Sequence, residues 1–227
     1  MTAAQTHVTP STPMGATLVD GGATFRVWAP GALAVHVALD DAAGFVPSAG
    51  TELRRDPATG HWTGFFPGVV DGTRYRFHVV GAGAAGLKRD PWARELQGSY
   101  PNYDCIVRDP GSYPWHDAGF RPPAFSDLAI YQFHIGVFSA RDGRGNDLRH
   151  YRVAKFLDAL DRVEYLADLG VNAVQPLPVV EFHGPWSVGY NGTDIFSPEM
   201  DYGVAPPTSG RTWTASTGCW PARASGR

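Results

Sequence analysis

The chain has 227 residues, of which 43% are apolar and 18% are charged, and its formal net charge is −3. This composition is typical of a globular protein with one large or two modest domains, and the charge offers no basic surface for nucleic acid. No apolar run approaches the ~20 residues of a membrane-spanning helix, so we expect no membrane partner either.

The two cysteines, Cys105 and Cys219, stand far apart in the sequence. Their separation matches no metal-binding or redox spacing, so we expect no disulfide framework, no metal site and no cofactor. Residues 1–14 are rich in Thr, Pro and Ser and lack the basic and apolar regions of a secretory signal. They predict a disordered N-terminal tail on a cytoplasmic protein.

Short alternating segments separated by Gly, Pro and Asp fill residues 15–108. In ATFRVWAP, Phe25 and Val27 alternate with other side chains, and LAVHVALDD and RYRFHVV show the same period of two. This alternation is typical of strands that bury one face, and turn residues such as Asp71-Gly72 stand between them. The pattern predicts an antiparallel β-sandwich.

Residues 109–127 contain several prolines and aromatic residues, which exclude a regular helix or a central strand. Flexible linkers are rarely this aromatic. We therefore expect an ordered linker in which Trp115, Phe120 and Phe125 pack in a groove between the domains.

Residues 128–203 predict a strand, a helix and a second strand. The runs Tyr131–Phe138 and Val171–Val179 are continuously apolar, as buried parallel strands are. Between them, apolar residues recur at helical spacing from Val153 to Leu169, and Gly170 follows as the expected C′ glycine. This order predicts a βαβ crossover, the opening of an α/β fold.

The motifs IYQFHIGVFS, FLDALDRVEYLADLGVNAVQPLPVVEF and GYNGTDIFSPEMDYG, in this order, resemble the start of the catalytic (β/α)8 barrel of glycoside hydrolase family 13, the α-amylase family. The branch that they most resemble holds 1,4-α-glucan branching enzymes, isoamylases and maltooligosyltrehalose trehalohydrolases. The preceding segment, which closes with RDPWAREL, resembles carbohydrate-binding module family 48. The resemblance implies an all-β immunoglobulin-like sandwich followed by the first βαβ part of an incomplete TIM barrel.

The resemblance also implies an α-1,4-glucan or a maltooligosaccharide as the ligand. Enzymes of this family use two carboxylates, which follow the fourth and fifth barrel strands, whereas the residues after the linker fit two strands of a ~250-residue barrel. We therefore expect no catalytic residue and an inactive chain, most like a truncated branching enzyme. The alternatives are a trehalohydrolase or isoamylase-like fragment, or a non-catalytic glucan-binding protein.

Residues 204–227 show no helical or strand period and contain no Asp or Glu. Their composition breaks from the family pattern before them, so we interpret them as an irregular tail read out of frame. The alternative is a divergent disordered tail.

Gly189 and Tyr190 match the Gly-Tyr position at which the family stacks an aromatic ring on the sugar, and they are the expected substrate-binding residues. The alternative is a core tyrosine. For Trp28 and Trp62, a core position is favoured over glucan stacking.

Other polar residues favour structural roles. His134 lies inside a predicted strand and is expected to be a core histidine. Asp194, Glu199 and Asp201 form an apparent carboxylate cluster, but a loop and turn role is favoured.

Overall fold

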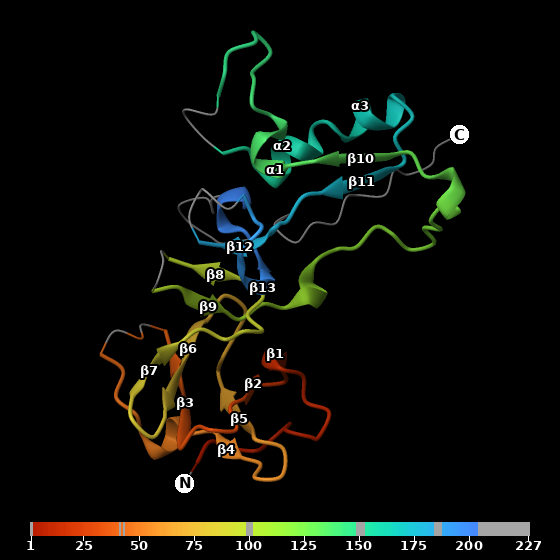
Figure 1. Ribbon diagram of the computed structural model, residues 1–227. Coiled ribbons are helices and arrows are strands. Elements are labelled where there is room, and N and C mark those ends of the chain that lie inside the picture. Colours follow the sequence, from red (N-terminus) through yellow and green to blue (C-terminus); the bar gives the residue numbers. More distant parts are fainter. Residues whose placement is uncertain are drawn as a thin grey trace. The chain divides into compact units, whose positions relative to one another are not determined.

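The computed structural model describes residues 2–40, 42, 44–98, 102–148, 153–183 and 188–203 (Figure 1). The chain divides into two compact units. Unit 1 comprises Met1–Pro110 with Asp194–Ser197, and unit 2 comprises Gly111–Thr193 with the residues from Pro198 onward. The predicted irregular tail and Cys219 lie outside the described residues, and no helix within the described ranges is long and apolar enough to span a membrane.

Two antiparallel sheets form unit 1, as the period-two segments predict. The first sheet has the order β1-β2-β5-β4, with strands Gly15–Val19, Gly22–Trp28, His61–Pro67 and Arg54–Arg55. The second sheet has the order β3-β6-β9-β8, with strands Ala34–Leu39, Arg74–Val80, Asp104–Ile106 and Leu96–Gln97. A further strand of this sheet, β7 (Ala85–Lys88), pairs with β6. The short 3-10 helix η1 spans Ala49–Thr51. The predicted sandwich is confirmed.

The core of the sandwich is aromatic. Phe25 on β2 is fully buried and meets Tyr75 and Phe77 on β6 edge to face, with ring centroids 5.1 and 6.5 Å apart. These contacts join the two sheets. Full burial of one such side chain stabilises the folded state by about 1.5–3 kcal/mol relative to an exposed side chain. The buried Trp62 donates its indole N–H to the carbonyl oxygen of Ala29 at 2.9 Å, so the core prediction for Trp62 is confirmed.

The prediction of a disordered N-terminal tail is wrong for residues 2–14. The Ala3 amide donates to the Glu52 carbonyl oxygen at 2.7 Å, and Ala4 forms a β-bridge with Phe65. β4 pairs only with Trp62 and Thr63, which leaves the edge of β5 open beyond them. Because an unpaired strand edge offers backbone hydrogen bonds to any nearby chain, the tail occupies it.

Unit 2 contains the predicted parallel pair. β10 (Ile130–Phe133) pairs with β11 (Ala173–Pro176) in parallel, with Ile130 opposite Ala173. Three helices stand between these strands in the sequence: α1 (Ile135–Phe138), α2 (Phe156–Leu160) and α3 (Val163–Asp168). The crossover is therefore confirmed, although the single helix predicted between Val153 and Leu169 is divided into α2 and α3.

The predicted long strand over Tyr131–Phe138 is wrong beyond Phe133, because the chain turns into α1. Ile130 and Tyr131 are also partly exposed rather than buried. A continuous apolar run fits a strand and a buried helical turn equally well, so periodicity could not separate them. The run supplies part of an apolar cluster whose buried members are Phe133, Ile135, Ala159 and Tyr202.

The remaining elements are short. β12 (Val180–Phe182) and β13 (Gly192–Pro198) form a two-stranded sheet, and 3-10 turns span Pro110–Ser112, Phe125–Asp127 and Met200–Tyr202. Gly170 has φ = 97° after α3, as its predicted C′ role requires. Trp115, Phe120 and Phe125 are exposed, and their packing between the domains stays a prediction.

Candidate functional site

Gly189 and Tyr190 occupy a tight turn between β12 and β13. Gly189 has φ = 89°, and a Cβ atom there would lie 2.6 Å from the carbonyl oxygen of Pro178. Both facts require glycine, because other residues rarely adopt this φ and would clash. Tyr190 is 68% exposed, so its ring is not buried among the described residues, and the sugar contact stays a prediction.

A polar network lies near the end of β10. The hydroxyl of Tyr202 and Nε2 of His134 are 3.2 Å apart, and the rings meet at 82°. Burial raises the pKa of Tyr202 to about 12, and the charges of Glu199 and Asp201 add to the effect. Tyr202 is therefore a neutral hydrogen-bonding group at ordinary pH, and His134 has a specific partner that the sequence did not reveal.

Two buried carboxylates hold the backbone of the β12 and β13 region. The Glu199 carboxylate accepts from the amides of Phe182 and Asp201 at 3.1 and 3.0 Å, and Glu181 accepts from the Met200 amide at 3.1 Å. Burial raises the pKa of Glu199, although these amide bonds act in the opposite direction. The predicted turn role is confirmed for Glu199.

The members of the apparent carboxylate cluster are divided between the two compact units. Asp194 belongs to unit 1, where it pairs with Arg89 at 3.4 Å, whereas Glu199 and Asp201 belong to unit 2. The described residues contain no group of three or more His, Cys, Asp or Glu side chains that could hold a metal ion.

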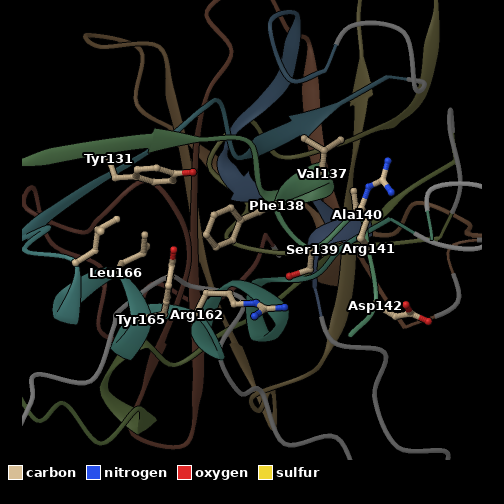
Figure 2. Close-up of a pocket in the computed structure, with 11 residues that line it drawn as sticks. Tyr131, Val137, Phe138, Ser139, Ala140, Arg141, Asp142, Arg162, Tyr165 and Leu166 are labelled. Atoms are coloured by element: carbon tan, nitrogen blue, oxygen red, sulfur yellow. The ribbon is translucent and has the colours of Figure 1, made fainter. Parts of the chain in front are cut away.

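A hollow of about 640 Å³ lies within unit 2. Figure 2 shows Tyr131 from β10, Phe138 from α1 and Tyr165 from α3 around the same space. The lining combines apolar and aromatic side chains with polar groups that include Arg141 and Arg162, and it contains neither Gly189 nor Tyr190. The hollow is thus an open face of the βαβ unit with a mixed polar and apolar lining, and it does not include the predicted sugar contact.

Trp28 at the end of β2 is 60% exposed, whereas the sequence favoured a core position. Its indole N–H donates to the Thr59 carbonyl oxygen at 3.1 Å, which fixes the ring while leaving it open to solvent. Behind the ring, Gly60 has φ = 77°, and a Cβ atom there would lie 2.8 Å from Cβ of Pro30. The ring is therefore an aromatic platform held by a rigid turn.

The turn that supports Trp28 is itself hydrogen-bonded. The Asp56 carboxylate accepts from the Thr59 hydroxyl at 2.7 Å and from the Ala58 amide at 2.9 Å, and these bonds lower the pKa of Asp56. Nδ1 of His61 lies 2.9 Å from the same hydroxyl. Polar groups that could bind sugar hydroxyls therefore stand beside the platform.

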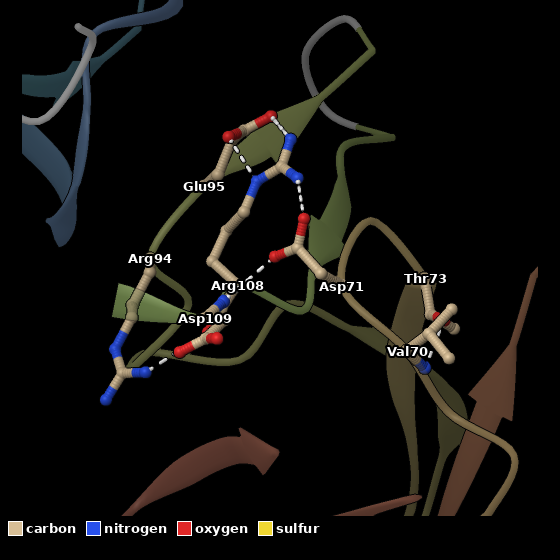
Figure 3. Close-up of polar contacts among 7 residues, drawn as sticks. All are labelled: Val70, Asp71, Thr73, Arg94, Glu95, Arg108 and Asp109. Atoms are coloured by element: carbon tan, nitrogen blue, oxygen red, sulfur yellow. Dashed lines mark hydrogen bonds and ion pairs between the residues drawn. The ribbon is translucent and has the colours of Figure 1, made fainter. Parts of the chain in front are cut away.

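A charged cluster elsewhere in unit 1 has a structural character. Figure 3 shows the buried Arg108 between Glu95, which it contacts with two nitrogens at 2.7 and 2.8 Å, and Asp71 at 3.0 Å. Burial alone would lower the pKa of Arg108, but the hydrogen bonds and charges of Glu95 and Asp71 have the larger effect and raise that pKa. Because each partner is already occupied, this cluster offers no ligand site.

Comparison with known proteins finds a family model that matches part of the chain, and relatives that are longer than it. Residues 13–93 match the family described as "Carbohydrate-binding module 48 (Isoamylase N-terminal domain)". The chain is 35% identical to a 1,4-alpha-glucan branching enzyme GlgB of Vibrio parahaemolyticus over 63% of this chain and 19% of the relative. For the corresponding enzyme of Jannaschia sp. the identity is 32%, over 86% of this chain and 27% of the relative.

Solved structures of longer proteins share the fold of this chain. A putative alpha amylase from Salmonella typhimurium is 29% identical with a TM-score of 0.66, over 85% of this chain and 29% of that one. Pullulanase from Paenibacillus barengoltzii, at 22% identity, has a TM-score of 0.67 over 86% of this chain and 33% of that one, and shares the fold. The chain thus spans between a fifth and a third of the length of these proteins.

Proposed function

We propose that the chain is part of an α-glucan-metabolising enzyme of glycoside hydrolase family 13 and binds α-1,4-glucan, because residues 13–93 match carbohydrate-binding module 48 and the chain is similar to 1,4-alpha-glucan branching enzymes. The relatives named above make 1,4-α-glucan branching enzyme the preferred assignment. The sandwich would hold the glucan chain.

The platform of Trp28 carries this proposal. The apolar C–H face of a glucose ring stacks on an aromatic ring, and a fixed ring gives up little conformational entropy on binding. Trp28 is such a ring, since its N–H is tied to Thr59 while its side chain remains exposed. Asp56 and His61 lie in the supporting turn, within reach of the same hydrogen-bond network.

The test is a titration of the chain with maltoheptaose and with amylopectin. We expect Trp28→Ala to weaken binding by roughly tenfold or more, as loss of one stacking contact does, and Trp28→Phe to keep part of the affinity. Trp115→Ala is the matched control, because Trp115 is an exposed tryptophan outside the sandwich. Equal affinities of the Trp28→Ala and Trp115→Ala variants would refute the assignment of the site.

We propose Gly189 and Tyr190 as a second sugar contact, in a βαβ unit that begins a (β/α)8 barrel. The exposed ring of Tyr190 and the parallel pair β10–β11 support this proposal.

We propose that the described residues bind glucan without cleaving it. Retaining enzymes of this kind need two carboxyl groups about 5 Å apart across the scissile bond. The buried carboxylates Glu181 and Glu199 serve backbone amides, and Asp194 serves Arg89. Iodine-stain and reducing-end assays on amylose should therefore show no activity, and turnover abolished by substituting one of these residues would contradict the proposal.

A further inference from the structure

A short segment late in the sequence is part of unit 1. Ser197 donates its hydroxyl to the carbonyl oxygen of Ala93 at 2.7 Å, across a sequence separation of 104 residues, and this bond is buried. Phe196 stacks on Trp92 with the ring centroids 4.4 Å apart and the planes inclined by 12°. Asp194 completes the contact through Arg89. The segment Asp194–Ser197 therefore meets the sandwich at three points.

The turn that receives it, Arg89–Ala93, is held rigidly from behind. The Asp90 carboxyl accepts the hydroxyl of Tyr75 at 2.6 Å and the Trp92 amide at 2.9 Å. A Cβ atom on Gly15, whose φ is 79°, would lie 3.0 Å from Cβ of Trp92, so glycine is needed where the turn meets β1. The receiving surface is thus formed by residues of the sandwich, which hold the turn through hydrogen bonds of their own.

The charged contact selects an acidic residue. Asp194 is only 4% exposed, and a buried carboxylate is costly without a partner. The guanidinium of Arg89 supplies that partner and is itself held over the ring of Tyr103, 5.3 Å from its centroid. Within the described residues, one further oxygen of Asp194 and one further nitrogen of Arg89 are buried without hydrogen bonds. A neutral residue in place of Arg89 would leave Asp194 as a buried, unpaired charge, and a neutral residue in place of Asp194 would leave Arg89, whose side chain is 25% exposed, without its partner.

We propose that the Arg89–Ala93 turn is a recognition site for an extended Asp-X-Phe-Ser segment, filled within the chain by Asp194–Ser197. Each residue of the motif has its own contact: the carboxylate with Arg89, the aromatic ring with Trp92, and the hydroxyl with the backbone of Ala93. Ile195 occupies the X position of the motif and is 66% exposed. The partner that the surface fits is an acidic and aromatic peptide in an extended conformation.

Hydrogen exchange on the intact chain tests the site. Arg89→Met and Asp194→Asn should each accelerate exchange of the 194–197 amides by roughly tenfold relative to those of β5, and the double variant should exchange no faster. Arg89→Lys, which keeps the charge, should retain most of the protection. Ile195→Ala is the matched control and should exchange like the unsubstituted chain. Unchanged protection in Asp194→Asn, or fully additive effects, would overturn the proposal.

A peptide added in trans provides the second measurement and does not depend on the stability of the Arg89 variants. A blocked heptapeptide of residues 192–198 should bind the Phe196→Ala chain saturably, because the internal segment then competes weakly. The same peptide with Asn at the Asp194 position should bind at least tenfold more weakly. Equal binding of the two peptides would show that the surface does not recognise the carboxylate and would refute the site.

Discussion

Replacing Arg108 by methionine should destabilise the sandwich more than any other single charge removal in the cluster of Figure 3. Arg108 makes two bonds to Glu95 and one to Asp71, and its side chain is 4% exposed. Breaking a fully buried pair costs ~3–5 kcal/mol. Glu95 and Asp71 are partly exposed, so water can hydrate their carboxylates once Arg108 is gone. We therefore expect Arg108→Met to lower the free energy of unfolding by ~2–3 kcal/mol.

Urea unfolding followed by tryptophan fluorescence measures this loss. The matched control is Arg74→Met, since Arg74 lies 3.7 Å from Asp104 and its side chain is 43% exposed. Exposed pairs of this kind contribute less than about 1 kcal/mol. The slope of the unfolding free energy with urea should not change, because both variants bury the same surface. Equal losses for the two variants would refute the reasoning that burial of Arg108 decides the effect.

Three further predictions concern single buried positions. Burial raises the pKa of Asp90 from 3.8 to about 6, so protonated Asp90 stabilises the fold below about pH 4 and this stabilisation is lost as the pH rises through 6. The free energy of unfolding should therefore fall by ~3 kcal/mol between pH 4 and 8, and Asp90→Asn should remove this fall, as measured by urea unfolding. Gly189→Ala should weaken maltoheptaose binding at Tyr190 by displacing the turn from Pro178, and an affinity equal to that of the unsubstituted chain would contradict this. Gly64→Ala should cost ~1–3 kcal/mol in urea unfolding, because its Cβ atom would lie 2.7 Å from Leu53 and 2.8 Å from Ala3.

The strands of the sandwich could be predicted because each repeats one local rule. Phe25 and Val27 alternate with exposed or polar positions, and the turn between them and the next strand carries its own residue signals. The tail at residues 2–14 could not be predicted, because its partner is the open edge of β5, and edges are a property of the assembled sheet. Composition alone therefore suggested disorder where the structure has backbone pairing.

The two candidate aromatic contacts differ in how the sequence could find them. Tyr190 was suggested by a motif, and the structure adds that Gly189 must be glycine and that the ring is exposed. Trp28 was placed in the core by general expectation, and nothing in its neighbours shows that Thr59 takes its N–H and holds the ring outward. The period of two puts Trp28 on the face of β2 opposite the buried Val27, whereas the hydrogen bond to Thr59, which fixes the ring, is a tertiary contact that the sequence does not record.

The physical boundary of the sandwich differs from the boundary that sequence similarity gives it. The family match ends at residue 93, within the turn that receives Asp194–Ser197. The Asp90 amide in that turn donates to the sulfur of Cys105 at 3.2 Å, and β9 pairs with β6, so residues beyond the match complete the second sheet. Each of these contacts satisfies a buried group that would otherwise be unpaired. The compact unit therefore extends beyond the family match to Pro110 and includes the distant segment Asp194–Ser197, which supplies the partner of Arg89.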